Sequence, residues 1–496
     1  MTTLYNIMRK ILIPVCALAL STACFGQSKK KAPNVLFILV DDMQSTCIHA
    51  YGCDQVYSPN IDRIVNNGVS FTRTYTNGSL GGALSMPSRA MIMTGRGVYQ
   101  VIQDGAQIPE QHVTMPELFR QNGYTTFATG KWHSDYKSFT RSFSTGENIF
   151  FGGMHTYETN GHVSPRLHHY DPSGNYSEKP FIGEKFSSEM FADAAVDFLK
   201  SRKKEKNPFF AFVSFTSPHD PRMQHPDYAH GYKADTLNLP INFLPQHPFD
   251  NGDMKVRDEV LTPVPRTKEA IQKELAGYYG MISEVDTQIG RVIQALRESG
   301  ELDNTILVFA SDNGLAVGQH GLLGKQNLYD HSVRVPLVIS APGMDKEKGT
   351  KRDANCYLYD IYPTLCDLTG IRPAPSVTGK SLLPVLKGAD KHRDCLFLAY
   401  NSIQRGLVKD GWKYIVYNVG GFRTEQLFDL KNDPWEMVNH AQEPVYAFKL
   451  SAYKNLLKEE MKRNNDFCNL DDFYWWGNGE MLPWNNAMKL YTDPNK

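Results

Sequence analysis

Four runs of strand-forming residues, separated by helical patterns, constrain the fold of this chain more than any other feature. They span residues 35–40, 125–129, 209–215 and 305–310. Strands of this apolar kind are typical of a parallel or mixed sheet whose two faces are both covered by helices. The segments 187–200 and 268–299 carry apolar side chains at helical spacing and fit such covering helices. We therefore predict an α/β protein with a large mixed, mostly parallel sheet sandwiched by helices.

Each of the four runs ends in polar residues. The residues that follow them are Asp41-Asp42, Lys131-Trp132-His133, Ser217-Pro218-His219 and Asp312-Asn313. Ligands of open α/β sheets bind at the carboxyl ends of the strands. We therefore expect these polar groups to converge on one edge of the sheet and to form an active site.

The side chains at two of these strand ends predict a metal site. Asp41, Asp42, Asp312 and Asn313 supply three carboxylates and one amide. Such hard oxygen ligands suit Ca²⁺ or Mg²⁺ better than zinc, and calcium is the ion we predict first. The alternative for Asp41-Asp42 taken alone is that paired acids at a strand end cap a following helix.

The pattern of the sequence changes after about residue 385. Short strand-like pieces follow at 395–400, 405–408, 412–417 and 425–430, and a helical segment covers 447–463. This order predicts a smaller C-terminal antiparallel α+β subdomain. We divide the chain into a leader at 1–26, a catalytic domain at 32–385 and the C-terminal subdomain at 386–496.

The N-terminus has the order of a secretory signal peptide. Two basic residues precede an apolar run at 11–20, and small residues follow at 21–23. The run is too short to span a bilayer as a permanent helix, and we expect no transmembrane segment later in the chain. Ordinary cleavage near Gly26 and lipidation at Cys24 are the two alternatives. We expect an exported protein that is periplasmic or lipid-anchored at the cell envelope.

Charge and cysteine content argue against two further classes of function. The 53 Lys and Arg residues equal the 53 Asp and Glu residues, so we expect no nucleic-acid or membrane-surface partner. The cysteines after the leader lack Cys-x-x-Cys spacing, which argues against a zinc site. Cys47 and Cys53 are either a local disulfide or buried free thiols.

Residues 85–96 form the most specific motif: Ser-Met-Pro-Ser-Arg-Ala-Met-Ile-Met-Thr-Gly-Arg. This segment resembles the signature of the type I sulfatases of the alkaline phosphatase superfamily, and residues 426–436 resemble a segment of that family's C-terminal subdomain. The resemblance implies that Ser85 is oxidised to formylglycine, also called 3-oxoalanine. The hydrated aldehyde has two hydroxyls, so one can attack the sulfur of a sulfate ester and the other can later expel sulfate. Because position 85 is Ser, the chain is similar to serine-type bacterial members, which a radical iron-sulfur enzyme matures.

The resemblance also implies which residues bind the metal and the modified side chain. The implied calcium ligands are Asp41, Asp42, Asp312, Asn313 and an oxygen of the modified Ser85. Arg89 would lie one helical turn from Ser85 if the motif is helical, and it matches the arginine that holds the formylglycine.

Two lysines and two histidines complete the implied site. Lys131 and Lys325 match the sulfate-binding lysines, and together with the cation they would stabilise the charge that develops during transfer. His133 would accept a proton from the formylglycine hydrate, and His219 would protonate the departing alcohol oxygen or at least hydrogen-bond to it. His320 either contributes to this pocket or makes a structural hydrogen bond to its glycine-rich loop.

Two long insertions, at 134–185 and 220–266, bear on the substrate. They are rich in polar and aromatic side chains, including His155, Arg166, His168, His169, Arg222 and His225. Such loops above a sheet suit hydroxyl-rich ligands, and exported sulfatases resemble scavengers of sulfated glycans. We therefore expect a carbohydrate sulfatase whose partner is a sulfated glycan. A phosphodiesterase or phosphonate hydrolase of the same superfamily, and an inactive glycan-binding protein, are the alternatives.

Overall fold

The computed structural model describes residues 31–475 except 178, 224, 226–230 and 467. The predicted leader at 1–26, with the lipidation alternative at Cys24, lies outside these residues. In the described part of the chain, no helix combines the length and the apolar character that a membrane span requires.

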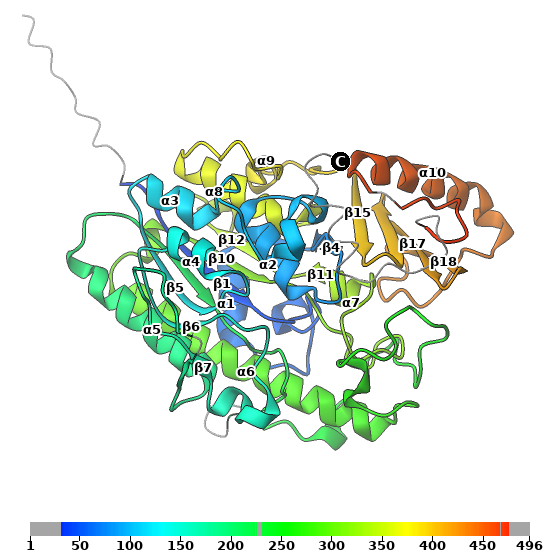
Figure 1. Ribbon diagram of the computed structural model, residues 1–496, viewed down its shortest axis with the longest axis horizontal. Coiled ribbons are helices and arrows are strands. Elements are labelled where there is room, and N and C mark those ends of the chain that lie inside the picture. Colours follow the sequence, from blue (N-terminus) through cyan, green and yellow to red (C-terminus); the bar gives the residue numbers. More distant parts are fainter. Residues whose placement is uncertain (1–30, 178, 224, 226–230, 467, 476–496) are drawn as a thin grey trace, which may run out of the picture. The chain divides into compact units, whose positions relative to one another are not determined.

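An eight-stranded sheet forms the centre of the fold (Figure 1). Its strand order is β13 (Lys351–Arg352), β2 (Val69–Phe71), β12 (Leu337–Ser340), β10 (Thr305–Ser311), β1 (Asn34–Val40), β9 (Phe209–Ser214), β5 (Thr125–Lys131) and β6 (Thr145–Phe150). Strands β10, β1, β9, β5 and β6 are parallel, whereas β12 is antiparallel to β10 and β2. The predicted mixed, mostly parallel sheet is confirmed. The four predicted runs are the adjacent strands β10, β1, β9 and β5.

Helices cover both faces of this sheet (Figure 1). One layer contains α2 (Ser85–Thr94), α3 (Met115–Gln121) and α8 (Ile361–Thr369), and the other contains α1 (Pro59–Asn67), α5 (Ser187–Ser201) and α6 (Lys268–Glu298). Successive residues of β1 pack in different cores: Phe37 lies in the core of the first layer and Ile38 in the core of the second. This alternation explains why β1 is apolar throughout, because a strand turns successive side chains to opposite faces.

Local sequence signals set where two of these helices begin. The Thr114 hydroxyl accepts a hydrogen bond from the backbone N–H of Glu117 at the start of α3. The Thr267 hydroxyl does the same for Ala270 at the start of α6. Such caps satisfy backbone donors that the first helical turn leaves unpaired. The helices predicted at 187–200 and 268–299 are α5 and α6.

The C-terminal part forms a second sheet, as predicted. Its strands are β15 (Cys395–Tyr400), β16 (Gln404–Lys409), β17 (Trp412–Val419) and β18 (Phe422–Asp429), which form an antiparallel meander against which α10 (Ala447–Arg463) packs. A short strand from the N-terminal part, β4 (Gly78–Ser79), pairs in parallel with β15. A Cβ at Gly78, which has φ +98°, would lie 1.8 Å from the carbonyl oxygen of Ala399. Only glycine allows the backbone at residue 78 to come this close to Ala399. Strand β4 thereby connects the loop before α2 to the C-terminal sheet. The division at residue 385 stays a prediction.

Short elements complete the described part. They include a three-stranded sheet of β3 (Thr74–Tyr75), β11 (Arg334–Val335) and β14 (Cys356–Tyr357), a ribbon of β7 (Arg166–Leu167) and β8 (Phe181–Ile182), and the helices α4 (Tyr136–Ser142), α7 (Asp330–Val333) and α9 (Leu383–Leu386).

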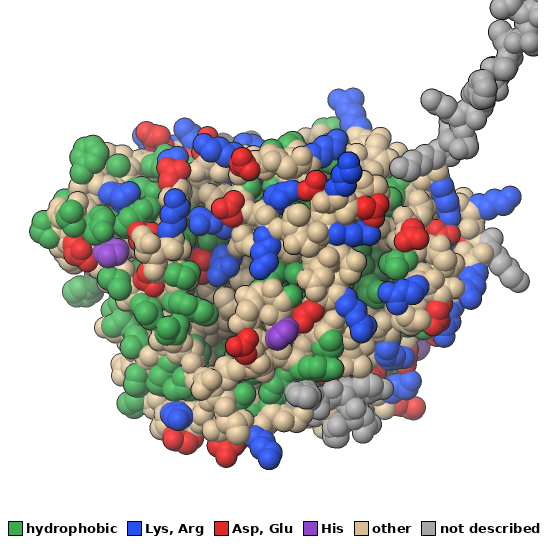
Figure 2. Space-filling view, turned by 180° about the vertical axis from the view of Figure 1, so that it is seen from behind, with side chains coloured by type: hydrophobic (Ala, Val, Ile, Leu, Met, Phe, Trp, Pro, Cys, Tyr) green, Lys and Arg blue, Asp and Glu red, His purple; other side chains and the backbone are tan. Residues whose placement is uncertain are grey.

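Cys47 and Cys53 are free thiols in the structure, so of the two alternatives for this pair the disulfide is not formed. Figure 2 shows acidic and basic side chains interspersed over one face of the molecule.

Candidate active site

Polar side chains from the four predicted strand ends meet at one edge of the large sheet. The set comprises Asp41 and Asp42 after β1, Asp312 and Asn313 after β10, Lys131 at the end of β5, His219 after β9, and Ser85 and Arg89 in α2. All of these side chains are buried. The expected convergence of the strand ends is therefore present in the structure.

Ser85 is the first residue of α2, and its hydroxyl touches the acidic groups. Its Oγ lies 3.1 Å from Asp41 Oδ1 and 3.0 Å from Asn313 Oδ1. The preceding residue, Leu84, provides no side-chain cap for the helix. The positive end of the helix dipole is therefore at residue 85, where it favours an anionic ligand or a developing negative charge.

Two buried lysines pair with the two carboxylates that follow β1. Lys131 Nζ lies 2.6 Å from Asp41 Oδ2, and Lys325 Nζ lies 2.7 Å from both oxygens of Asp42. Burial alone would raise the pKa of Asp41, but Lys131 and then Arg89 outweigh it and hold this pKa well below its usual value. Asp41 is therefore ionised in a site that is shielded from water.

Arg89 connects α2 to three strand ends. Its Nε donates to Asp312 Oδ2 at 2.8 Å, and its Nη1 donates to Ser214 Oγ at 2.6 Å and to the Lys131 carbonyl at 3.1 Å. Burial, followed by the charge of Asp41, raises the pKa of Asp312 to about 6. Ser214 was not among the predicted residues, because a serine inside an apolar strand carries no sequence signal of its own.

The donor set suits a hard divalent cation. Among the described residues, Asp41, Asp42 and His219 each offer one ligand atom, and these atoms lie within 4.8 Å of one another. Asn313 contacts both Ser85 and Asp42, since its Nδ2 donates to Asp42 Oδ1 at 2.6 Å. Asp312 instead accepts from Arg89 and from the backbone N–H of Asp42 at 3.2 Å. Carboxylate and amide oxygens dominate this set, so the residues present fit Ca²⁺ or Mg²⁺.

His219 is oriented by the residue that follows it. Its Nδ1 lies 2.8 Å from the Asp220 carbonyl oxygen, and its Nε2 lies 3.6 Å from Asp42 Oδ2. Burial and Lys325 act to lower the pKa of His219, but Asp42, Asp220 and Asp41 outweigh them and raise it. The protonated ring is therefore favoured, as a general acid requires. Asp220 is itself held by Arg257, whose Nη2 lies 3.0 Å from its Oδ1.

His133 has the opposite protonation preference. Burial, then Lys131 and Arg89, hold the pKa of His133 well below its usual value, so the ring is neutral. Its Nδ1 is buried and has no hydrogen-bond partner among the described residues. The backbone at His133 has φ +66°, a left-handed conformation that is uncommon for residues with a side chain. A neutral ring with an unpaired nitrogen can accept a proton.

The first insertion brings two further histidines to this region. His162 contacts the backbone carbonyl of His219 through Nε2 at 3.1 Å and Ser187 Oγ through Nδ1 at 2.8 Å. The ring of His155 lies 4.9 Å from that of His162, and its buried Nε2 has no hydrogen-bond partner among the described residues. Sequence reasoning marked His155 as one of several polar residues of the insertion and gave no signal for His162.

Other predicted residues of the insertions pair with carboxylates instead. Arg222 forms an ion pair with Glu274, His225 Nε2 lies 3.1 Å from Glu189, and the exposed His169 lies 2.6 Å from Glu147. The ring of His320 stacks on that of Tyr329 at 4.0 Å between centroids, and its Nε2 lies 3.1 Å from Asn242 Nδ2. These contacts favour the structural alternative for His320.

Known protein families match nearly the whole described chain. The family model described as "Sulfatase" matches residues 33–371, and the one described as "N-sulphoglucosamine sulphohydrolase, C-terminal" matches residues 318–465. The chain is 26% identical, over an alignment of 530 residues, to an N-acetylglucosamine-6-O-sulfatase of Bacteroides thetaiotaomicron. The alignment covers 92% of this chain and 91% of that protein. It is 29% identical over 486 residues to a sulfatase of Formosa agariphila, over 90% of this chain and 91% of that protein.

Solved structures share the fold. One is a protein in complex with its substrate D-glucosamine-2-N,6-O-disulfate, with a TM-score of 0.72, 25% identity, and coverage of 88% of this chain and 99% of that one. Another is a phosphonate monoester hydrolase of Agrobacterium radiobacter, with a TM-score of 0.69, 24% identity, and coverage of 89% and 98%. At this identity the second likeness establishes the fold alone.

Proposed function

The chain belongs to the sulfatase family of sulfuric ester hydrolases, in the alkaline phosphatase superfamily, and from this membership we propose that it hydrolyses sulfate esters of carbohydrates through a formylglycine made from Ser85. The observation that carries the proposal is the position of the Ser85 hydroxyl, at 3.1 Å from Asp41 and 3.0 Å from Asn313, at the head of α2. A hydrated aldehyde at this position supplies one hydroxyl for attack on sulfur and a second for release of sulfate. The partner that this requires is a radical iron-sulfur maturation enzyme.

Asp41, Asp42, Asp312 and Asn313 would hold a calcium ion next to residue 85, with magnesium as the other ion that the donors suit. A bound divalent cation supplies Lewis-acid polarisation of a sulfate oxygen and a fixed template for the reacting groups. Arg89 holds this arrangement together, because it contacts Asp312 as well as the ends of β5 and β9. Lys131 and Lys325 are the groups available to bind the remaining sulfate oxygens, and their charges favour the transition state of transfer.

His219 and His133 each carry out one of the two proton transfers. Burial lowers the pKa of His219, but Asp42 and Asp220 outweigh it and raise this pKa. The protonated ring that results suits protonation of the departing sugar oxygen. The neutral His133, whose Nδ1 has no partner among the residues that the structure describes, suits acceptance of the hydrate proton that precedes sulfate release. The two shifts favour a protonated His219 and a neutral His133, which are the starting protonation states that the two proton transfers need.

A sulfated glycan is the substrate class that we propose. Relatives whose names state a substrate include the N-acetylglucosamine-6-O-sulfatase of Bacteroides thetaiotaomicron and an ulvan-active sulfatase of Formosa agariphila. The insertions add polar side chains near the site, and the buried Nε2 of His155 has no hydrogen-bond partner in the described part of the chain. We also propose that the protein is exported and acts in the periplasm or at the cell envelope.

Phosphonate ester hydrolysis is the second candidate, because the phosphonate monoester hydrolase of Agrobacterium radiobacter shares the fold. The experiment compares release of inorganic sulfate from N-acetylglucosamine 6-sulfate with hydrolysis of a phosphonate monoester by the matured enzyme. We expect faster turnover of the sulfate ester, and we expect Ser85→Ala to reduce it to background while the thermal unfolding midpoint stays unchanged. Preferred cleavage of the phosphonate, or substantial turnover by Ser85→Ala, would contradict the proposal.

A further inference from the structure

His219 lies in a short turn that follows β9 and is held by hydrogen bonds of its backbone. The His219 N–H donates to the Thr216 carbonyl at 3.1 Å, and the Asp41 N–H donates to the Ser217 carbonyl at 3.2 Å. The His219 carbonyl oxygen is bonded by a side chain instead. His162 of the first insertion approaches it through Nε2 at 3.1 Å. A residue far away in the sequence therefore holds the backbone of the proposed general acid.

His162 contacts both ends of this turn. Its Nδ1 lies 2.8 Å from Ser187 Oγ, on the first residue of α5, and 3.4 Å from Thr216 Oγ1. The hydroxyls of Ser187 and Thr216 lie 3.2 Å apart. One imidazole ring thereby spans the turn from Thr216 to His219.

The partners of His162 determine which ring nitrogen carries the hydrogen. Burial lowers the pKa of His162 to about 4, although the bond to the His219 carbonyl acts against this effect, so the ring is neutral at pH 7. A carbonyl oxygen only accepts, and Nε2 therefore donates to it. Nδ1 is then the acceptor for the Ser187 hydroxyl. Because both nitrogens are bonded within the protein, the ring is suited to positioning rather than to proton transfer.

Packing keeps the His162 ring in this orientation. The side chain is fully buried. It stacks on Phe186, with 5.4 Å between ring centroids and 19° between the ring planes, and it meets His155 edge-on at 4.9 Å. The donor at Nε2 is therefore already aimed at the His219 carbonyl before a substrate binds.

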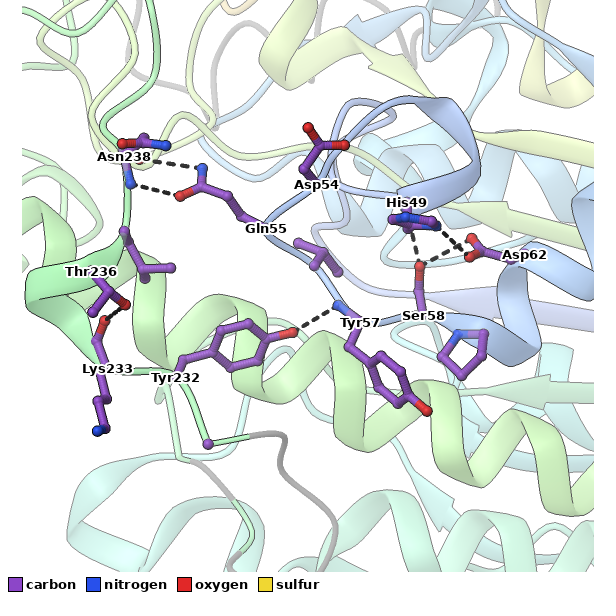
Figure 3. Close-up of a pocket in the computed structure, with 14 residues that line it drawn as sticks. His49, Asp54, Gln55, Tyr57, Ser58, Asp62, Tyr232, Lys233, Thr236 and Asn238 are labelled. Carbon is purple, nitrogen blue, oxygen red and sulfur yellow. Dashed lines mark hydrogen bonds and ion pairs between the residues drawn. The ribbon is translucent and has the colours of Figure 1, made fainter.

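A later part of the insertion that follows His219 is anchored separately (Figure 3). Residues of the segments 49–62 and 231–238 line a cavity of about 670 Å³, and none of the proposed active-site residues lines it. There the Asn238 N–H donates to Gln55 Oε1 at 2.6 Å, and the Tyr57 N–H donates to the Tyr232 hydroxyl at 2.8 Å (Figure 3). A variant that loses one of these contacts is a control for general loosening of the insertion.

We propose that His162 is a positioning residue for His219, because its Nε2–H holds the His219 carbonyl and with it the backbone from which the ring of the acid extends. The inference rests on the proposed function, in which His219 protonates the departing oxygen. The held carbonyl and the acid belong to the same residue, so a shift of one moves the other. A displacement of about 1 Å at a reacting group can cost about 10²-fold in rate.

The test compares kcat/KM on N-acetylglucosamine 6-sulfate with kcat/KM on 4-nitrophenyl sulfate for the matured protein. The amide of His162→Asn takes the place of Nδ1 and is too short to reach the His219 carbonyl, whereas His162→Gln extends an amide N–H to the place of Nε2. We expect His162→Asn to lower the value for the sugar sulfate by about 10–10²-fold and the value for the aryl sulfate far less, because a phenolate departs without an acid. His162→Gln should recover most of this loss.

Two controls separate positioning from a structural role. The ratio of the two kcat/KM values does not depend on the fraction of folded, matured enzyme, so a loss of folded protein cannot imitate the effect. Gln55→Ala, which removes the contact with Asn238, should leave the ratio unchanged. Adding His162→Asn to His219→Ala should change the ratio no further, because the acid that it positions is already absent.

A wild-type ratio in His162→Asn, equal losses on both substrates, no recovery by His162→Gln, or a further change in the double variant would overturn the inference. Failure of the proposed function would be distinguishable, because it would appear in the wild type as an absence of sulfate release from sulfate esters.

Discussion

At the scale of single residues, His219 is held with one ring nitrogen committed to the backbone. Its Nδ1 lies 2.8 Å from the Asp220 carbonyl oxygen, so Nε2 is the nitrogen left on the side of Asp42. A ring fixed in this way can deliver a proton to an ester oxygen with little reorganisation, which is what makes a positioned acid effective.

Loss of His219 should therefore depend on the leaving group. We expect His219→Ala to slow release of sulfate from a sugar by about 10²–10⁴-fold, and to slow release from 4-nitrophenyl sulfate far less, because a phenolate departs without protonation. The ratio of kcat/KM values on the two substrates is the measurement. His440→Ala, on a half-buried histidine of the C-terminal part that pairs with Glu443, is the control and should change neither rate. Equal losses on both substrates would assign His219 to sulfate binding instead.

Single residues were predictable from the sequence where a motif or a strand end marked them. Ser85 stands in a specific motif, Asp41 directly follows an apolar run, and Asp312 follows another after one serine. Ser214 and His162 carried no such mark, because their roles arise from contacts with Arg89 and with the backbone of His219 that only the folded chain creates. The sequence also could not predict that Lys131 pairs with Asp41 and Lys325 with Asp42.

At the scale of elements, the metal site depends on the register of parallel strands. Val40 of β1 pairs with Ser311 of β10, so Asp41 and Asp312 leave the sheet side by side. Apolar runs and their polar ends were enough to predict this edge, because parallel strands place their carboxyl ends together. Strand β4 was not predicted, since Gly78–Ser79 is too short to show a period-two pattern and is defined by its partner β15.

Removal of a divalent cation should abolish activity if these strand ends bind one. Prolonged treatment with EDTA is expected to suppress sulfate release, and calcium should restore it better than magnesium, because the oxygen donors form a hard and adaptable site. Activity of the chelated enzyme titrated with each ion is the measurement. Restoration by zinc alone would contradict the oxygen-ligand assignment.

At the scale of the whole molecule, a buried acid links the catalytic part to the start of the C-terminal sheet. Asp360, just before α8, accepts from Arg393 Nε at 2.9 Å and contacts His392 Nε2 at 3.1 Å, and both partners lie shortly before β15. Burial alone would raise the pKa of Asp360, but Arg393 and then His392 outweigh it and lower the pKa to about 2. The carboxylate therefore stabilises the folded state at neutral pH.

This linkage predicts how stability changes with pH. An unfolded aspartate has a pKa of about 3.9, so the contribution of Asp360 is complete above about pH 4 and is lost as the pH falls towards 2. The difference of about two pKa units corresponds to roughly 2–3 kcal/mol. We expect the gap in unfolding midpoint between the wild type and Asp360→Asn to be largest at pH 7 and to shrink below pH 4. Asp390→Asn, at an exposed aspartate, is the control. A gap that is constant from pH 7 to pH 3 would contradict the assignment.

The central claim is that Ser85 becomes the formylglycine of a sulfatase, and the mass of the tryptic peptide Thr74–Arg89 tests it most directly. We predict that protein purified from its native host, or made together with a radical iron-sulfur maturation enzyme, yields this peptide two hydrogens lighter than its sequence requires, with the loss at residue 85. The Ser85→Ala protein should give the unmodified mass. An unmodified Ser85 in a preparation that releases sulfate would contradict the account.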